Sequence, residues 1–304
     1  MDGISQRGNC TMKKIGFLGA GKVGTTLGKY FAEHSVEVAG YYSRSISSAS
    51  EAAAFTGSRV FESAKGVLAA SDVLFLTVPD GAIRTVYDAL PKELLRGKIL
   101  CHASGALTAK EAFPDIEIFG GSGCSVHPLF AVSDKKLAYR ELVDVFFAVE
   151  GTPACLPKVT EWLRSLGLHA QRMDGSKKRL YHAAAVVASN HVVALFAEAM
   201  DMLEACGFDE DAARAALAPL FLGNARHVAE DGPQKALTGP VERGDATTVE
   251  KHLEALEDAD DRALYRLLTK RLLKIAKAKH SKRDFAAIEE LVSNNSNEKD
   301  GTKS

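Results

Sequence analysis

Short apolar runs alternate with longer helical stretches over the first half of this 304-residue chain. Alternation of this kind predicts parallel strands joined by helices, in a doubly wound α/β sheet with helices on both faces. Ligands of such sheets bind beyond the carboxyl ends of the strands, so we expect chemistry in the loops that follow them. The expected strands cover residues 14–18, 36–42, 58–60, 73–78, 99–102, 122–126, 144–150 and 169–172.

The pattern changes after residue 174, where helical composition takes over. Residues 178–206 are rich in Ala, Val and Leu without Pro or Gly, and Gly207 then offers a helix C-cap. A capping box of Thr247 and Glu250 marks the start of a later helix. The further helices are expected over residues 209–230, 247–257 and 258–280.

These patterns divide the chain into four segments. We predict an α/β domain over residues 13–174 and an all-helical domain over residues 175–290. Residues 1–12 and 291–304 are polar, show no apolar periodicity and are expected to be disordered. Residues 1–12 also lack the apolar stretch of a secretory signal.

The amino-acid composition limits the classes of partner that we expect the protein to bind. A hydrophobic content of 46% is enough for a large core, and a net charge of −1 gives no electrostatic pull toward nucleic acid or an anionic membrane. No apolar run approaches the length of a membrane span. We therefore expect a small-molecule substrate and other copies of the chain as partners, with no nucleic acid and no membrane.

The cysteines indicate the redox environment in which the protein is found. They are dispersed and show neither C-x-x-C nor another metal-ligand spacing, which is typical of a reducing cytosol and predicts no metal site. The five are Cys10, Cys101, Cys124, Cys155 and Cys206.

A glycine-rich turn directly follows the first expected strand. A helix and a second strand come after it, which is the context that the G-x-G-x-x-G dinucleotide fingerprint requires. Gly19 allows the tight turn, Gly21 leaves room for the pyrophosphate, and Gly24 lets the helix pack closely on the strand. The phosphates would lie at a helix N-terminus, where free N–H groups and the helix dipole favour anions. The loop residues expected to bind the cofactor are Gly19, Ala20, Gly21, Lys22, Val23 and Gly24.

The end of the second expected strand indicates which dinucleotide binds. An NAD site usually has Asp or Glu here, whereas this chain has Ser43, Arg44 and Ser45. Arg44 can pair with a phosphate dianion, and the two serines can donate hydrogen bonds to it. We therefore predict NADP as the cofactor of a Rossmann domain; the alternative is that Arg44 is a solvated loop residue.

Two further strand ends are expected to border the cofactor. Val78, Pro79 and Asp80 lie at the carboxyl end of the fourth strand, and we interpret the side chain of Asp80 as a helix cap. The small residues around Ser104 after the fifth strand form a candidate floor for the nicotinamide. His102, at the end of that strand, is equally well explained as a packed histidine.

Candidate catalytic groups come from the sixth strand and the long helix. Pro128 holds His127 in an extended conformation at the mouth of the expected cleft. Lys178 and His182 lie on one helical stripe, with Asn190 at its edge. A Lys or His in a desolvated cleft can have its pKa lowered enough to protonate the alkoxide that ketone reduction creates. A solvated Lys and His at a helix start are the alternative.

A Gly/Pro-containing loop between helices, residues 237–245, carries the last candidate. Arg243 in this loop has the planar fork that can bind a substrate carboxylate with two hydrogen bonds. Otherwise the segment is a tight interhelical connector.

These separated motifs together resemble a family of NADP oxidoreductases that combine a Rossmann-like N-terminal domain with a helical domain of unknown function, number 2520. The resemblance spans residues 12 to about 288. It implies a homodimer whose helical domain is similar to the C-terminal domain of 6-phosphogluconate dehydrogenase. More distant relatives are ketopantoate reductases, pyrroline-5-carboxylate reductases, β-hydroxyacid dehydrogenases and prephenate dehydrogenases. The motifs that carry the resemblance are residues 19–24, 42–45, 102–105, 127–129, Lys178 with 181–184, and 238–245.

The resemblance implies a cytoplasmic, NADPH-dependent oxidoreductase that reduces a small carboxylate-bearing ketone or imine near Ser104, with 2-ketopantoate as the first substrate to consider. Lys178 or His182 would protonate the product, while His127, Asn190 and Arg243 orient the substrate. There is one departure, because ketopantoate reductases and hydroxyacid dehydrogenases typically place Asn four residues after the catalytic Lys, where this chain has His182. Two alternatives stay open: a prephenate-type dehydrogenase, suggested by His127-Pro128-Leu129, and a non-catalytic NADP-binding redox sensor.

Overall fold

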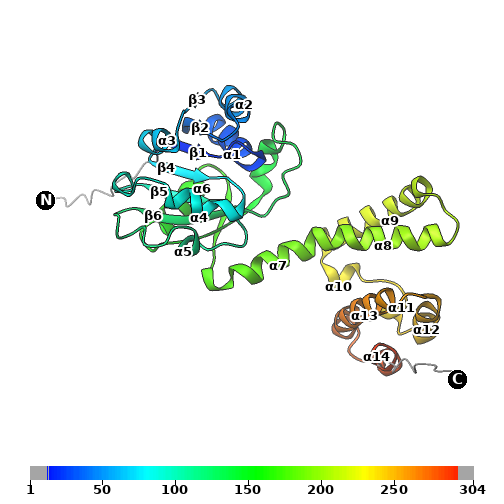
Figure 1. Ribbon diagram of the computed structural model, residues 1–304. Helices are drawn as coiled ribbons and strands as arrows, with labels where there is room; N and C mark the ends of the chain where they lie inside the picture. The colour runs from blue at the N-terminus through cyan, green and yellow to red at the C-terminus, as the bar shows by residue number, and fades with distance from the viewer. Residues whose placement is uncertain (1–11, 13, 294–304) are drawn as a thin grey trace, which may run out of the picture. The chain divides into compact units, whose positions relative to one another are not determined.

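The computed structural model describes residue 12 and residues 14–293 (Figure 1). Most of the two ends expected to be disordered, residues 1–12 and 291–304, therefore lies outside the described residues. Met12 is described and is buried, and residues 291–293 belong to the last helix. The described chain forms two compact units, the first ending at His191 and the second beginning at Val192.

The first unit is built on one eight-stranded sheet. Its strand order is β3-β2-β1-β4-β5-β6-β7-β8. Each strand corresponds to one expected from the sequence, with ends that differ by at most two residues. The strands are β1 (Lys14–Leu18), β2 (Glu37–Tyr42), β3 (Arg59–Val60), β4 (Val73–Leu76), β5 (Ile99–His102), β6 (Ser122–Pro128), β7 (Phe146–Gly151) and β8 (His169–Arg172).

The sheet departs from the predicted parallel arrangement at one pair of strands. β6 and β7 pair antiparallel, and β8 is parallel to β7, so the last two strands run against the other six. Parallel neighbours need a crossover connection, usually an α-helix. The segment between β6 and β7 contains only the 3-10 helix η2 (Ala138–Asp144), so it lacks such a crossover helix. The fold remains a doubly wound, mostly parallel α/β sheet.

Helices cover both faces of this sheet (Figure 1). Ile15 and Phe17 of β1 belong to the core on one face, and Leu18 belongs to the core on the other. Because successive strand side chains point to opposite faces, even the short β1 anchors both layers. The first face packs on α1 (Lys22–Glu33), α2 (Ile46–Thr56) and α6 (Leu156–Ser165); the second packs on α3 (Ala64–Ala70), α4 (Asp80–Asp88) and α5 (Ala109–Ala112).

The long helix expected over residues 178–206 is interrupted. It consists of α7 (Lys178–Ala188) and α8 (Asn190–Ala205), with Ser189 in a non-helical conformation between them. The Oγ of Ser189 donates a hydrogen bond of 2.7 Å to the carbonyl of Ala185. A serine that bonds back to the preceding turn in this way often bends a helix. α7 belongs to the first unit, although the sequence pattern changes before it.

The second unit is helical, as expected, with two local corrections. The predicted capping box at Thr247 and Glu250 is wrong, because the side chain of Asp245 accepts the hydrogen bond from the N–H of Thr248 at 3.1 Å. The expected Gly/Pro loop contains the short helix α11 (Pro240–Arg243). The remaining helices are α9 (Glu210–Asp231), α10 (Pro233–Ala236), α12 (Ala246–Ala255), α13 (Ala259–Lys279) and α14 (Ala286–Ser293).

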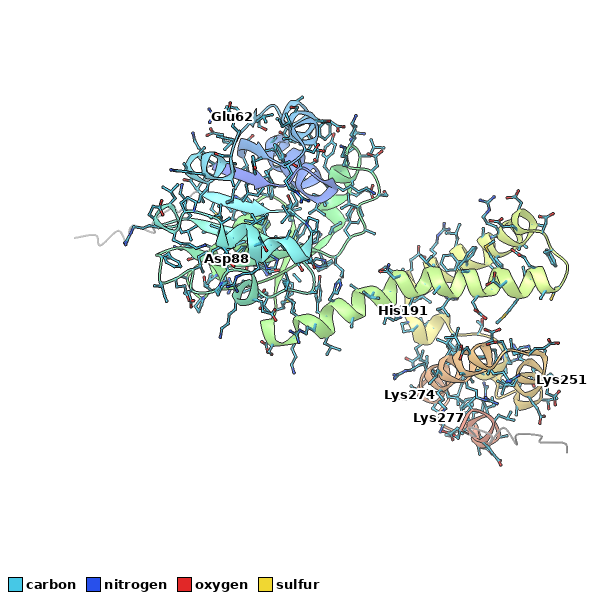
Figure 2. All side chains as sticks on the ribbon, in the orientation of Figure 1. Glu62, Asp88, His191, Lys251, Lys274 and Lys277 are labelled. Atoms are coloured by element: carbon cyan, nitrogen blue, oxygen red, sulfur yellow. The ribbon has the colours of Figure 1, made fainter. Side chains whose placement is uncertain are left out.

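The buried core of this unit lies among α10 to α14. Apolar side chains such as Val249, Leu273 and Ile288 pack together there. Lys277 on α13 adds an ion pair with Glu289 on α14 at the surface (Figure 2). Neither α8 nor α9 contributes a residue to this core.

The helical stretch of 31 residues from Gly175 to Ala205 is long and apolar enough to cross a membrane, by length and composition alone. The expectation that no run approaches the length of a span is therefore wrong for this stretch. None of the α8 residues is buried.

Candidate active site

The loop between β1 and α1 is shaped by its glycines and by Thr77. Gly19 has a φ of +106°, and a Cβ on it would lie 2.5 Å from the carbonyl oxygen of Thr77. A Cβ on Gly24 would collide with Thr77 Oγ1. That hydroxyl donates to the carbonyl of Gly19 at 3.0 Å, so Thr77, which the sequence did not single out, holds the loop against the end of β4.

The N-terminus of α1 is open. Gly21 occupies the N-cap position, no side chain caps the helix, and its first turn has no acidic residue. A Cβ on Gly21 would meet nothing within 4 Å. Lys22 beside it is exposed, whereas Ala20 is buried and Val23 packs against the core. Free N–H groups at an uncapped helix end form an anion site, so this surface fits a pyrophosphate.

The carboxyl end of β2 presents an exposed cation. Ser43 Oγ accepts a hydrogen bond from the N–H of Ser45, and Ser45 caps α2 by accepting from the N–H of Ser48. Arg44 between them is exposed, and the first turn of α2 has no acidic residue. An exposed guanidinium beside a helix N-terminus fits the 2′-phosphate of NADP.

The exits of β4 and β5 are tied together by side chains. Asp80 is the first residue of α4 and Pro79 takes the N-cap position, so the prediction that Asp80 caps this helix is wrong. The carboxylate of Asp80 instead accepts a hydrogen bond of 2.6 Å from Ser104 Oγ. Ser104 Oγ also accepts from the backbone N–H groups of Ala106 and Leu107. Ser104 therefore fixes the loop that follows β5 and links it to Asp80, which comes directly after Val78 and Pro79 in the chain.

His102 is a packed strand-end histidine. Its side chain is fully buried, its Nδ1 accepts from the N–H of Ser104 at 3.2 Å, and its ring meets Phe113 edge to face. Burial, with a smaller contribution from Lys178, lowers the pKa of His102 to about 3. This imidazole is therefore neutral at ordinary pH.

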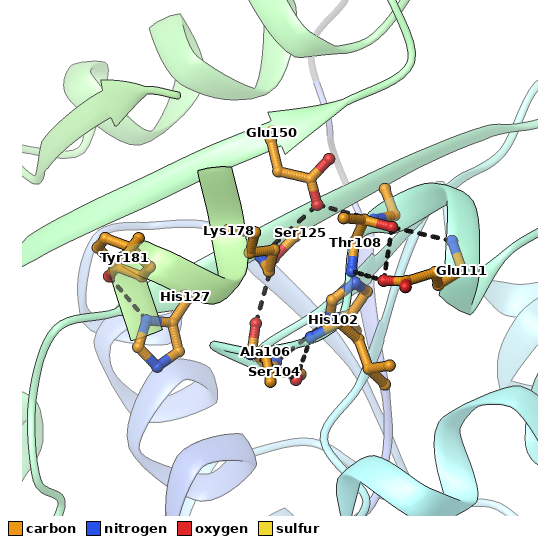
Figure 3. A network of polar contacts seen from close by, with 12 residues as sticks. His102, Ser104, Ala106, Thr108, Glu111, Ser125, His127, Glu150, Lys178 and Tyr181 are labelled. Atoms are coloured by element: carbon orange, nitrogen blue, oxygen red, sulfur yellow. Dashed lines mark hydrogen bonds and ion pairs between the residues drawn. The ribbon is translucent and has the colours of Figure 1, made fainter. Parts of the chain in front are cut away.

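Lys178 lies in a buried polar network at the start of α7 (Figure 3). Its side chain is fully buried; Nζ donates to Ser125 Oγ on β6 and lies 3.6 Å from Oε1 of Glu150 on β7. Glu150 Oε1 also accepts from the N–H of Ala109 at 2.7 Å. Burial lowers the pKa of Lys178 and raises the pKa of Glu150, and each charge partly offsets the shift of the other.

Ser125 and Glu150 were not among the predicted site residues. The one available signal was an acidic residue in the apolar run Phe146–Glu150, which is unusual in a strand that is buried on both faces. Periodicity alone does not show which strand carboxylate a distant lysine meets.

A second cluster, of imidazoles, surrounds Gly105. Nδ1 of His127 lies 2.8 Å from the hydroxyl of Tyr181 on α7, and the ring centroids of His127 and His182 are 6.1 Å apart. A Cβ on Gly105 would lie 2.5 Å from His182 Nδ1 and 2.8 Å from His127 Nε2. Burial, assisted by Lys178, lowers the pKa of His127 to about 4. His182 Nδ1 is buried and has no hydrogen-bond partner among residues 12 and 14–293.

Two predicted site residues are not part of either cluster. Asn190 begins α8, beyond the interruption at Ser189, and its Oδ1 lies 3.2 Å from Ser189 Oγ. Arg243 is exposed at the end of α11 in the second unit. Their proposed roles still rest on the sequence alone. Within the described part of the chain, no group of three or more His, Cys, Asp or Glu side chains is placed to hold a metal ion.

Two family models match parts of this chain. Residues 14–104 match the family described as NADP oxidoreductase coenzyme F420-dependent, and residues 145–272 match the domain of unknown function DUF2520. A search of curated proteins found no match.

Solved structures give a longer alignment. Protein TM1727 from Thermotoga maritima is 30% identical, with 87% of this chain and 99% of that chain covered at a TM-score of 0.70. A reductive aminase from Aspergillus terreus, in complex with NADPH and ethyl-5-oxohexanoate, is 17% identical, with coverages of 92% and 99% and a TM-score of 0.61. Pyrroline carboxylate reductase from Plasmodium falciparum, with NADP bound, is 15% identical, with coverages of 88% and 99% and a TM-score of 0.56.

The reductive aminase and the pyrroline carboxylate reductase show only that the fold is shared. TM1727 is 30% identical over almost its whole length, which shows that the two chains are homologous. Together with the two matched family models, it shows that this chain is an enzyme of the NADP oxidoreductase family in which a Rossmann-like domain is followed by the DUF2520 domain.

Proposed function

We propose that the protein is an NADPH-dependent reductase of a small carboxylate-bearing ketone or imine, with 2-ketopantoate as the first substrate to test. The observation that carries the proposal is the line of loops at the carboxyl edge of the sheet. The open N-terminus of α1 follows β1, and Arg44 follows β2. The imidazoles at Gly105 lie at the ends of β5 and β6. The names of the two more distant structural neighbours, a reductive aminase and a pyrroline carboxylate reductase, support imines as well as ketones.

NADPH, when bound, supplies the hydride that reduces the substrate carbon. The chain itself binds the pyrophosphate at the N-terminus of α1, selects the 2′-phosphate with Arg44, and brings proton-bearing groups to the loop after Ser104. Among the three candidate proton donors, the contacts favour His127 and His182, which face Gly105, over Lys178, whose ammonium is enclosed by Ser125 and Glu150. Lys178 then acts by positioning β6 and β7.

Arg243 and Asn190 are proposed to orient the substrate carboxylate. Their residue types suit this task, since a guanidinium binds a carboxylate through two parallel hydrogen bonds and an amide adds a donor. This part of the proposal rests on the sequence pattern.

We also propose a cytoplasmic homodimer. None of the α8 residues is buried, and α8 and α9 line an apolar cavity of about 340 Å³ with Val193, Phe196, Phe221 and Leu222 among its walls. A contiguous apolar surface of this kind is typical of an interface. The four described cysteines are free, which supports a reducing compartment.

The proposal is tested first by binding. NADPH and NADH are titrated separately into the purified protein and followed by nucleotide fluorescence, and we expect tighter binding of NADPH. Gly21→Ala should weaken both nucleotides at least about tenfold without lowering Tm, because the added methyl meets only the space that the pyrophosphate needs. Arg44→Ala should weaken NADPH alone, by about 10- to 100-fold, as expected for a lost hydrogen bond between charged groups.

Gly223→Ala on α9 is the matched control, because its Cβ also meets nothing within 4 Å but lies in the second unit. Equal affinity for NADPH and NADH would contradict the 2′-phosphate site, and the absence of binding would contradict the proposal as a whole. NADPH oxidation is then followed with 2-ketopantoate and with 1-pyrroline-2-carboxylate. Turnover of neither, with tight NADPH binding, would reject this substrate class and favour a redox sensor.

A further inference from the structure

His127 is a candidate proton donor, but its contact with Tyr181 has no role assigned so far. His127 lies near the end of β6, and its neighbour Pro128 holds the backbone extended. Tyr181 lies one turn into α7, and its hydroxyl is 2.8 Å from His127 Nδ1, with the two rings nearly perpendicular (Figure 3). The buried ammonium of Lys178 in the preceding turn anchors α7, so the tyrosine is held against the histidine.

The direction of this hydrogen bond follows from the surroundings. Burial lowers the pKa of His127 to about 4 and raises the pKa of Tyr181 to about 12, so at neutral pH the imidazole is neutral and the phenol keeps its proton. Among the described residues, the Tyr181 hydroxyl has no hydrogen-bond partner other than His127 Nδ1. A hydroxyl that donates to Nδ1 satisfies both groups and leaves the single imidazole proton on Nε2.

Nε2 is the atom that faces the proposed site. It approaches the position of a Cβ on Gly105 to 2.8 Å, on the loop that follows Ser104. A side chain at residue 105 would displace it, so the glycine permits the imidazole to reach the loop. The proton of Nε2 is therefore presented where the proposed function places the substrate.

We propose that Tyr181 and His127 form a proton relay, in which Tyr181 fixes the Nε2–H tautomer of His127 and replaces the proton that His127 gives to the product. The proposal rests on the proposed function. As the substrate carbon gains a hydride, the electron pair of its double bond moves to the oxygen or nitrogen. That atom takes the proton from Nε2, Nδ1 takes the proton of the Tyr181 hydroxyl, and the tyrosinate regains a proton from water. Tyr181 is partly exposed, so water reaches it. His127 is then the catalytic residue and Tyr181 a positioning residue.

The first test needs neither cofactor nor substrate. The protein is labelled with ¹⁵N-histidine, and the nitrogen shifts of His127, assigned by their loss in His127→Asn, report its tautomer by NMR. In the wild type we expect an acceptor-type Nδ1 and a protonated Nε2, and in Tyr181→Phe a mixture of the two tautomers. A protonated Nδ1 in the wild type, or an unchanged tautomer in Tyr181→Phe, would overturn the proposal.

The second test is kinetic. With a substrate that the wild type turns over, Tyr181→Phe is expected to lower kcat about 100-fold, the usual size of a general-acid contribution, while KM changes less than about threefold. Tyr87→Phe is the matched control, because it removes a phenol that also makes a 2.8 Å hydrogen bond in the first unit, to the carbonyl of Pro114. The control should leave kcat and the His127 tautomer unchanged.

An unchanged kcat in Tyr181→Phe would reject the relay even if the tautomer shifts. If the wild type binds NADPH but turns over no ketone or imine, the proposed function fails, while the NMR result still decides whether Tyr181 sets the tautomer. Circular dichroism of each variant checks that it is folded.

Discussion

The two units of this protein differ in their buried polar side chains and in their exposed helices. In the first, the side chains of Lys178 and His102 are fully buried and that of Glu150 nearly so, each with a hydrogen-bond partner in its own unit. In the second, α8 and α9 leave large apolar side chains in solvent, with Val193 70% and Leu222 61% exposed. Buried polar groups and exposed apolar surfaces are the two departures from the usual distribution that carry information. The first unit therefore holds the proposed catalytic groups, and the second holds the proposed interface.

Removing the buried cation should have the largest effect. Lys178→Met is expected to lower the free energy of unfolding by about 3–5 kcal/mol, because it leaves Glu150 buried without its partner. The double variant Lys178→Met with Glu150→Gln should recover much of this loss. Urea unfolding measures the free energy of unfolding of both variants. The control Lys177→Met, at an exposed neighbouring lysine, should lower this free energy by less than about 0.5 kcal/mol. A stable Lys178→Met variant would show that the first unit does not depend on its buried charges.

Acid should weaken the first unit by a somewhat smaller amount. The pKa of His102 is about 3 in the fold and near 6.5 in the unfolded chain, so the unfolded state binds a proton more readily. The stability that this depressed pKa contributes is complete above pH 6.5 and is lost as the pH falls toward 3. At pH 4.5 the expected loss is about 2–3 kcal/mol.

The measurement is the free energy of unfolding at pH 7.5 and 4.5, for the wild type and for His102→Asn. The asparagine keeps an acceptor for the N–H of Ser104 but does not titrate, so the variant should lose about 2–3 kcal/mol less between the two pH values than the wild type does. His127, with a pKa of about 4, contributes in the same direction in both proteins. Identical pH dependence in the two would contradict a neutral, buried His102.

Charging the exposed apolar surface should have the smallest effect on folding. Leu222→Arg is expected to change the free energy of unfolding of the monomer by less than about 0.5 kcal/mol, yet to weaken self-association at least about tenfold, because a charge would be desolvated at the interface. Light scattering over a concentration series measures the dissociation. Ile118→Arg makes the same change at a 78% exposed residue of the first unit and should leave assembly unaltered. A wild type that is monomeric at every concentration would remove the proposed interface.

The parts of the fold that were predictable are those that depend on neighbouring residues. The strand Lys14–Leu18, the glycine turn after it and the helix that begins at Lys22 follow from a local alternation of apolar and flexible positions. Asp209 and Asp258 cap the helices α9 and α13, close to where helical composition begins. The antiparallel pairing of β7 was not predictable, because an apolar strand has the same pattern in either direction.

The cofactor chemistry could be predicted without a structure, because the glycine loop and Ser43 to Ser45 are each short, contiguous segments whose conformation is fixed by local sterics and hydrogen bonds. The contacts of the catalytic candidates, in contrast, depend on how distant segments pack together. Lys178 meets Ser125, and Tyr181 meets His127, across 53 and 54 residues of chain. Which of these side chains is enclosed and which faces Gly105 depends on the register of β6 against its neighbours and on where α7 docks. Those relations arise from packing, and no local pattern encodes them.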